Sequence, residues 1–244
     1  MQLAGKRILI TGGNSGIGLR LAKQLHAKQN HIIVVSRTQN HWDELKALQP
    51  DVTLLQCDLA SQEQVLEMVR RIKENDVTLD VLVNCAAVQN TPALVDKDFR
   101  FDGIAPEATT NFVAPVWLSH LLLPDLLTRP EAAIVNISSG LAFYPKTTSA
   151  VYCATKAALH SFSQSLRYQL AKTTVSVVEV FLPLVDTPMT SGRGKGKMSP
   201  EYVAQKIIEG VQRKRNEIYV GKARLLPLMI RIWPGLVKRI LQRY

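Results

Sequence analysis

The chain has 244 residues, which is enough for one sizeable hydrophobic core and short for two, so a single domain is expected over residues 1–244. Its net charge of +10 is uneven, because residues 186–244 hold 13 basic and 4 acidic residues. A local basic end indicates an anionic partner for that end and disfavours a nucleic-acid-binding protein. The three cysteines have no paired or metal-ligand spacing, so no metal site is expected. We also expect a cytoplasmic protein, because the sequence shows no signal peptide and no apolar run long enough to span a membrane.

Short apolar runs alternate with helix-like segments along the chain. Strands are predicted at residues 7–11, 31–36, 52–56, 81–86, 132–138, 175–182 and 217–220. Helices are predicted between them at residues 16–29, 41–48, 61–75, about 108–128, 152–172 and 200–213. Strands that are apolar on both faces and alternate with helices are typical of a covered parallel sheet. The fold class is therefore α/β, a single-domain Rossmann-type doubly wound parallel sheet of about seven strands.

A glycine-rich turn, Thr11-Gly-Gly-Asn-Ser-Gly-Ile-Gly18, joins the first predicted strand to the first predicted helix. Its glycines allow a tight turn, a close approach of the backbone to a pyrophosphate and close packing of helix on strand. The helix N-terminus then directs unpaired N–H groups at the phosphates. The turn thus predicts a dinucleotide site. The residues expected at the phosphates are Gly12, Asn14, Ser15, Gly16, Ile17 and Gly18.

The second predicted strand ends in Val34-Val-Ser-Arg-Thr38, without the carboxylate that an NAD site usually directs at the ribose 2′-hydroxyl. Ser36 and Arg37 instead offer a hydroxyl and a guanidinium group, which suit a 2′-phosphate. NADP(H) is therefore the expected cofactor. The alternative is that Arg37 is a solvated loop residue.

Tyr152 and Lys156 are four residues apart, which places them on one face of a predicted helix. A tyrosine of ordinary pKa is a poor base at neutral pH, but a neighbouring ammonium group favours the phenolate and lowers the pKa. Tyr152 is then a general acid for reduction of a carbonyl and a general base for oxidation of an alcohol.

The glycine spacing matches the Thr-Gly-x-x-x-Gly-x-Gly fingerprint of the short-chain dehydrogenase/reductase family, which the sequence resembles over nearly its whole length. The resemblance implies that Ser139, which lies 13 residues before Tyr152, binds the substrate oxygen, with Ser138 as the second choice. It also implies that Asn111 holds a water that connects Lys156 to solvent. The implied catalytic residues are Asn111, Ser139, Tyr152 and Lys156.

The same resemblance implies further cofactor contacts beyond the glycine-rich turn. Three residues depart from the family's motifs: Cys85 and Ala87 after the fourth strand, and Leu184 where the family has glycine. Because leucine rarely adopts a positive φ, the loop around Leu184 is expected to differ locally. The implied contacts are Asp58, Leu59, Asn84, Ala86, Tyr152, Lys156, Pro183, Val185 and Thr187.

Two segments near the end carry most of the basic excess. Residues 186–199 alternate glycine and basic residues, which indicates either a mobile cationic substrate loop or a plain solvated loop. Residues 223–244 form a basic apolar tail of two short helices, because Pro227 and Pro234 interrupt it, with Arg224, Arg231 and Lys238 on one spine. The tail either packs on the protein or lies on an anionic membrane surface.

The segment 202–244 resembles, more specifically, the short-chain oxidoreductases found with teichoic-acid D-alanylation genes. The helices at about 108–128 and 152–172 are apolar over more than one stripe, so a homodimer or homotetramer is expected. The expected function is NADP(H)-dependent hydride transfer to or from a small carbonyl or alcohol substrate. The alternative is a catalytically quiet NADP(H)-binding scaffold or redox-sensing regulator.

Overall fold

A computed structural model describes residues 1–48, 50–75 and 78–243. Its strands form one parallel sheet in the order β3-β2-β1-β4-β5-β6-β7. This arrangement confirms the predicted fold class. The strand order reverses beside β1, so the carboxyl ends of β1 and β4 flank the crevice where such sheets bind ligands. The strands are β1 Arg7–Thr11, β2 His31–Ser36, β3 Val52–Gln56, β4 Val81–Asn84, β5 Ala132–Ser139, β6 Val175–Leu182 and β7 Glu217–Tyr219.

The helices follow the predicted order, with short 3₁₀ turns between them. The α-helices are α1 Gly16–His26, α2 Trp42–Lys46, α3 Gln62–Glu74, α4 Ile104–Ala108, α5 Ala114–Leu127, α6 Ala150–Gln169, α7 Pro200–Gln212, α8 Leu226–Ile232 and α9 Pro234–Gln242. The 3₁₀ turns are η1 Phe101–Gly103, η3 Gly140–Ala142, η4 Pro188–Thr190 and η5 Gly221–Leu225. No helix of the described ranges is long and apolar enough to cross a membrane.

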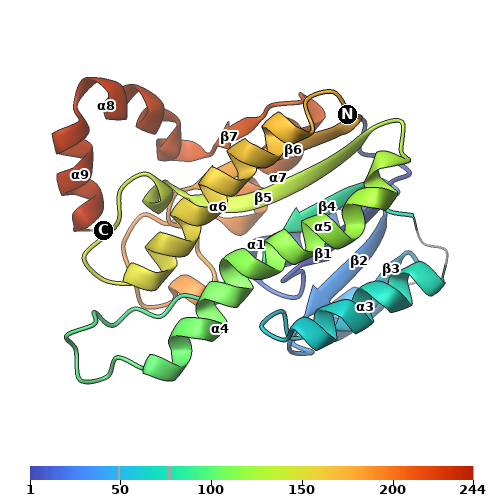
Figure 1. Ribbon diagram of the computed structural model, residues 1–244, viewed down its shortest axis with the longest axis horizontal. Helices are drawn as coiled ribbons and strands as arrows, with labels where there is room; N and C mark the ends of the chain where they lie inside the picture. Colours follow the sequence, from blue (N-terminus) through green and yellow to red (C-terminus); the bar gives the residue numbers. More distant parts are fainter. Residues whose placement is uncertain (49, 76–77, 244) are drawn as a thin grey trace.

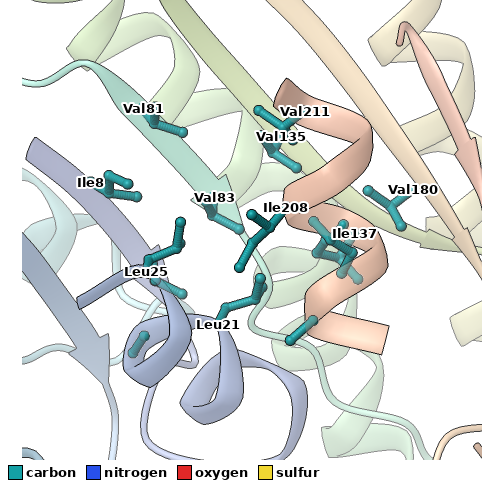
Figure 2. Packing of buried hydrophobic residues seen from close by; sticks show 14 of the residues in the cluster. Ile8, Leu21, Leu25, Val81, Val83, Val135, Ile137, Val180, Ile208 and Val211 are labelled. Atoms are coloured by element: carbon teal, nitrogen blue, oxygen red, sulfur yellow. The ribbon is translucent and has the colours of Figure 1, made fainter. Parts of the chain in front are cut away.

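Helices cover both faces of the sheet (Figure 1). α1 and α7 pack on one face, and α3, α5 and α6 pack on the other. Successive side chains of β1 serve the two layers in turn, since Ile8 and Ile10 join the α1 and α7 cluster whereas Leu9 joins the opposite one. Figure 2 shows the first cluster, in which side chains of α1 and α7 lie against the strands. Burial on both faces explains why the strands read as continuous apolar runs.

The single helix predicted at about 108–128 is interrupted, because a π-helical turn, η2 Thr109–Val113, separates α4 from α5. The residue four positions after Asn111 is Pro115, which has no N–H to donate to the Asn111 carbonyl. The α-helical ladder is therefore broken at Asn111, which is the middle residue of the π turn.

Buried polar contacts fix α6 on the sheet. Asn84 of β4 donates to Asn136 of β5 (2.8 Å), and Asn136 donates to the Ser163 hydroxyl of α6 (2.9 Å). One turn earlier on the same face of α6, His160 Nδ1 lies 2.8 Å from the carboxylate of Glu179, a fully buried residue of β6. These contacts determine where the first turns of α6 lie relative to the strand ends.

The sequence predicts that Arg224, Arg231 and Lys238 lie along one face of the tail, but the structure places them in three separate elements, η5, α8 and α9. Pro227 and Pro234 each stand in the first turn of a separate helix, where a missing N–H costs little. Arg224 lies before both helices, in η5, and donates to the Tyr219 carbonyl (3.3 Å). Tyr244, the last residue of the predicted tail, lies outside the described residues.

The His160–Glu179 pair makes stability depend on pH. Its hydrogen bond to Glu179 raises the pKa of His160 above its ordinary value. The pair's contribution is therefore fully present below the unfolded-state pKa of about 6.5 and is lost as pH rises through the raised folded pKa. We expect His160→Gln to lower the free energy of unfolding by about 1.5–3 kcal/mol at pH 5.5, and by less at pH 9.

Denaturant unfolding across pH measures this difference. His120→Gln, a change at an exposed histidine of α5, is the matched control and should follow the unmodified chain at every pH. A His160→Gln effect that stays constant from pH 5.5 to pH 9 would show that the ion pair does not contribute.

Candidate active site

A cleft of about 560 Å³ lies at the carboxyl ends of the strands and brings together residues from the whole length of the chain. Most of the residues singled out in the sequence line it. Those residues are Gly12, Asn14, Ser15, Gly16, Ile17, Gly18, Ser36, Arg37, Asp58, Leu59, Ala86, Ser139, Tyr152, Lys156, Pro183, Val185 and Thr187. Two of the predicted residues, Asn84 and Asn111, do not line it.

The glycine-rich turn forms a cradle that side chains would fill. Gly12 has a φ of +67°, and a Cβ there would lie 2.9 Å from the Ala86 Cα atom. A Cβ on Gly18 would lie 2.2 Å from the Gly12 carbonyl oxygen. Ser15, the N-cap of α1, makes no side-chain cap, so the N–H groups of the first turn have no side-chain acceptor there. This geometry fits the pyrophosphate of a dinucleotide.

At the far end of β2, the Ser36 hydroxyl is engaged within the protein. It donates to the Thr38 carbonyl (2.9 Å) and accepts from the Trp42 indole N–H (3.0 Å). Asn14 donates to the same carbonyl (2.9 Å), which ties the glycine-rich turn to the loop after β2. Arg37 is exposed at the rim of the cleft. The guanidinium of Arg37 is therefore the cationic group at this end, and Ser36 shapes the loop.

The first turns of α6 carry Tyr152 and Lys156 into the middle of the cleft. The Lys156 ammonium nitrogen lies 5.6 Å from the centre of the Tyr152 ring and donates to the Ile137 carbonyl of β5 (2.8 Å). Burial lowers the pKa of Lys156 to about 8, so the side chain is still mostly protonated at neutral pH. Ser139 ends β5 beside them, where its hydroxyl accepts from the Leu141 N–H (3.2 Å).

The environment of Tyr152 differs from the expected one. Burial raises the pKa of its phenol above the ordinary value, and the neighbouring Cys153 adds to this, whereas a hydrogen bond with Ser139 and the charge of Arg193 lower it. The sequence predicts a lowered pKa from Lys156 and the positive ring of an oxidised nicotinamide cofactor. Among the groups of the folded chain itself, desolvation outweighs the Ser139 hydrogen bond and the charge of Arg193. A neutral phenol is the form that donates a proton.

Asn111 connects two segments and does not line the cleft. Its side-chain oxygen accepts from the Val88 N–H (2.8 Å), and its amide group donates to the Val88 carbonyl (2.8 Å) and to the Thr155 hydroxyl (3.2 Å). The Asn111 side chain is thus used within the protein, and its part in a water relay stays an expectation from the family resemblance.

The segment after β4 contacts the cleft through residues other than Asn84. The Asn84 side chain donates to Asn136 within the buried polar contacts of the sheet and does not line the cleft. The Thr11 hydroxyl accepts from the N–H groups of Cys85 (3.0 Å) and Ala86 (3.0 Å) and draws this segment against the glycine-rich turn. Cys85 and Ala86 line the cleft in its place.

The loop after β6 is tied together at its base. The Leu184 carbonyl accepts from the Met198 N–H (3.0 Å), and the Met198 carbonyl accepts from the Asp186 N–H (2.8 Å). Leu184 is not among the described residues with positive φ, so leucine is accommodated without strain where the family has glycine. Within the loop, Arg193 and Lys195 line the cleft, whereas Lys197 is held away from it by Asp186 (3.3 Å).

Several lining residues carried no signal in the sequence. Val88, Gln89 and Thr110 enter the cleft because the segment after β4 and the π turn meet there, and Lys146 and Arg243 do so because loops and the tail converge. No motif marks any of them. In the described part of the chain no cluster of histidine, cysteine and carboxylate side chains is placed to hold a metal ion.

A doubly wound parallel sheet with a glycine-only cradle at its switch point is the architecture of a dinucleotide-binding oxidoreductase. The family model described as short chain dehydrogenase matches residues 6–197. The chain belongs to the short-chain dehydrogenase family.

Relatives agree with this assignment. The chain is 41% identical over 232 residues to the uncharacterized oxidoreductase DltE of Bacillus subtilis, with 89% of each chain covered. It is 31% identical over 243 residues to the fatty acyl-CoA reductase of Acinetobacter baylyi, covering 96% of this chain and 82% of the relative. The family inferred from the sequence is thereby confirmed. The more specific resemblance, to the oxidoreductases found with teichoic-acid D-alanylation genes, is confirmed by the match to DltE.

Solved structures agree in fold. A short chain dehydrogenase from Burkholderia cenocepacia in complex with NADP superposes with a TM-score of 0.87 at 21% identity and covers 99% of both chains. A 4-hydroxyisoleucine dehydrogenase complexed with NADH superposes with a TM-score of 0.81 at 20% identity, covering 88% of this chain and 96% of the other. The first of these neighbours was solved with NADP and the second with NADH.

Proposed function

We propose that the protein is an NADP(H)-dependent carbonyl reductase or alcohol dehydrogenase in which Tyr152 is the general acid and base. The observation that carries this proposal is the meeting of Tyr152, Ser139 and Lys156 in the middle of the cleft, next to the glycine cradle. The alternative of a quiet scaffold or regulator is disfavoured, because such a protein has no need of this group.

The bound nicotinamide supplies the hydride for reduction or accepts it in oxidation. In reduction, the Ser139 hydroxyl hydrogen-bonds the substrate oxygen, on which negative charge develops. Tyr152 donates its phenolic proton to that oxygen, so hydride and proton together convert the carbonyl to an alcohol. The raised pKa keeps the phenol protonated until this step. Lys156 then stabilises the phenolate, and the same steps run backwards in oxidation.

Removing the phenolic hydroxyl tests the catalytic role directly. We expect Tyr152→Phe to lower kcat by at least ~10²-fold, because the proton donor is lost while the ring is kept. NADPH consumption with aldehydes, ketones, quinones and a fatty acyl-CoA measures this, the last probe being chosen for the named activity of the Acinetobacter relative. Tyr168→Phe, at an exposed tyrosine of α6, is the control. Full turnover by Tyr152→Phe would exclude Tyr152 as the acid.

The preference for NADP(H) rests on Arg37, the exposed guanidinium beyond β2. A charge-assisted contact to a 2′-phosphate contributes about 1.5–3 kcal/mol, and NADH lacks that phosphate. We expect Arg37→Ala to raise KM for NADPH roughly 10- to 100-fold and to leave KM for NADH nearly unchanged. Lys28→Ala, at an exposed lysine after α1, is the control. If the ratio of the two KM values stays the same in Arg37→Ala, the phosphate does not bind there.

The proposed setting is the cytoplasm, and the three described free thiols support it. We propose in addition a homodimer or homotetramer built on α5 and α6, whose outer rows include the half-buried Trp117 and Phe162.

The tail is proposed to contact an anionic membrane surface. Val237 is buried, but Leu228 and Trp233 of the tail are 60% and 59% exposed, and Leu236 is 48% exposed. In Figure 1, α8 and α9 stand away from the sheet. Exposed leucine and tryptophan side chains flanked by arginine and lysine are typical of helices that lie in a headgroup layer.

Co-sedimentation with phosphatidylglycerol or phosphatidylcholine vesicles tests the tail, with light scattering alongside. We expect the full chain to bind the anionic vesicles at low salt. The combined variant Leu228→Ser, Trp233→Ser and Leu236→Ser should lose most of that binding and keep its oligomeric state, because it removes the buried apolar area. Leu94→Ser, at an exposed leucine far from the tail in sequence, is the control.

Three results would contradict these proposals. If the full chain stays in the supernatant with anionic vesicles, the tail does not bind a membrane. If the triple variant becomes a smaller assembly, the exposed side chains of the tail join two copies of the chain and do not bind a membrane. A monomer at micromolar concentration would exclude the proposed oligomer.

A further inference from the structure

Three basic residues from separate segments meet at one end of the cleft. Lys146 lies in the loop between η3 and α6, Arg193 in the loop after β6, and Arg243 at the end of α9, and all three line the cleft. We call them the cationic cluster. Neither the family motifs nor the cofactor account for these residues.

Interactions of Arg193 locate the cluster beside Tyr152. The charge of Arg193 acts on the pKa values of both Tyr152 and Lys146, so its guanidinium lies near both groups. Arg193 donates to the Gln89 side chain (2.9 Å), which holds it against the segment after β4. The loop after β6 therefore presents Arg193 to the reacting end of the cleft.

The tail brings Arg243 to the same place. The N–H and hydroxyl groups of Thr147 both donate to the Gln242 carbonyl, each at 3.0 Å, and Thr147 follows Lys146 directly. Lys146 and Arg243 also line a smaller hollow together. Figure 1 shows the end of α9 beside the loop that follows β5. The C-terminal helix thus forms part of the wall of the cleft.

No carboxylate of the described residues forms an ion pair with the cluster. The acidic side chain that acts on Tyr152 is Glu107, which is buried, accepts a hydrogen bond from Asn90 (2.8 Å) and has a pKa raised by burial. Burial and the charge of Arg193 both lower the pKa of Lys146. The fold therefore holds a half-buried ammonium beside a second cation, which is unfavourable until an anion binds.

The cofactor's own phosphates are accommodated elsewhere. The pyrophosphate fits the cradle between β1 and α1, and the proposed 2′-phosphate site is Arg37 after β2. The cluster instead belongs to segments after β5, after β6 and at the end of the tail. An anion bound there is therefore part of the substrate.

We infer that the substrate is a carbonyl or alcohol compound that carries a carboxylate or phosphate group, which Lys146, Arg193 and Arg243 bind while Tyr152 and Ser139 hold the reacting oxygen. This inference rests on the proposed function and adds the chemical class of the substrate. The basic residues of the loop 186–199 are Arg193, Lys195 and Lys197. Arg193 and Lys195 line the cleft, whereas Lys197 is paired with Asp186. The inferred anion site combines Arg193 of this loop with Lys146 and Arg243 from other segments.

Matched substrates that differ in charge test the inference. One pair is 4-carboxybenzaldehyde and its methyl ester, and the other is glyceraldehyde 3-phosphate and glyceraldehyde; the two pairs separate carboxylate from phosphate. We expect kcat/KM with NADPH to favour the charged member of at least one pair by ~10-fold or more. Lys146→Gln, Arg193→Gln and Arg243→Gln should each remove most of that preference, a drop of roughly 10-fold, because each removes a charge-assisted hydrogen bond.

Lys97→Gln, at an exposed lysine before η1, is the control and should keep the preference. Calorimetric titration of the NADPH-bound chain with benzoate and with inorganic phosphate adds a readout that needs no turnover. Binding of either anion that weakens in the three variants supports the inference.

The inference is overturned if the unmodified chain prefers neither charged substrate and binds neither anion. It is also overturned if all three variants keep the preference of the unmodified chain. The proposed function is judged separately, by whether any of these four aldehydes is reduced and whether Tyr152→Phe abolishes that reduction. A chain that reduces both members of each pair equally through Tyr152 would therefore keep the proposed function and lose the anionic substrate.

Discussion

The attachment of α6 to the sheet is the constraint on which the candidate site depends. Lys156 is bonded to the Ile137 carbonyl of β5, and further along the helix Ser163 accepts from Asn136 while His160 pairs with Glu179. These contacts are buried, so each would leave a polar group unsatisfied if the helix moved. The position of Tyr152 relative to the strand ends is therefore set by the polar interior of the protein.

The charged residues of the cleft lie in three places, which separate cofactor binding, proton transfer and the binding of a substrate anion. One rim carries Arg37, the middle carries the half-buried Tyr152 and the buried Lys156, and the other end carries the cationic cluster. The middle is the most desolvated part, which keeps the phenol neutral and lowers the pKa of Lys156. An anionic group on the substrate would thus be held by the cluster at a distance from the proton that is transferred.

The residue pattern predicted the structure correctly where the conformation depends on residues close together in the chain. The glycine-rich turn predicts its own conformation, because Gly12 and Gly18 stand where a Cβ would collide with backbone atoms. Pattern was insufficient where a side chain could face more than one way. Asn84 stands at a motif position but bonds Asn136 within the sheet, and Asn111 uses its side chain on Val88. Nothing in the local sequence indicates which partner a buried amide will find.

The sequence by itself determined the parallel sheet, the dinucleotide cradle and the pairing of Tyr152 with Lys156, because these follow from periodicity, glycine positions and helical spacing. Only the tertiary structure decided the pKa of Tyr152 and the membership of the cationic cluster. Both depend on burial and on contacts between segments far apart in the chain, such as Thr147 with Gln242. Desolvation and long-range proximity are properties of the folded chain, and no short stretch of sequence encodes them.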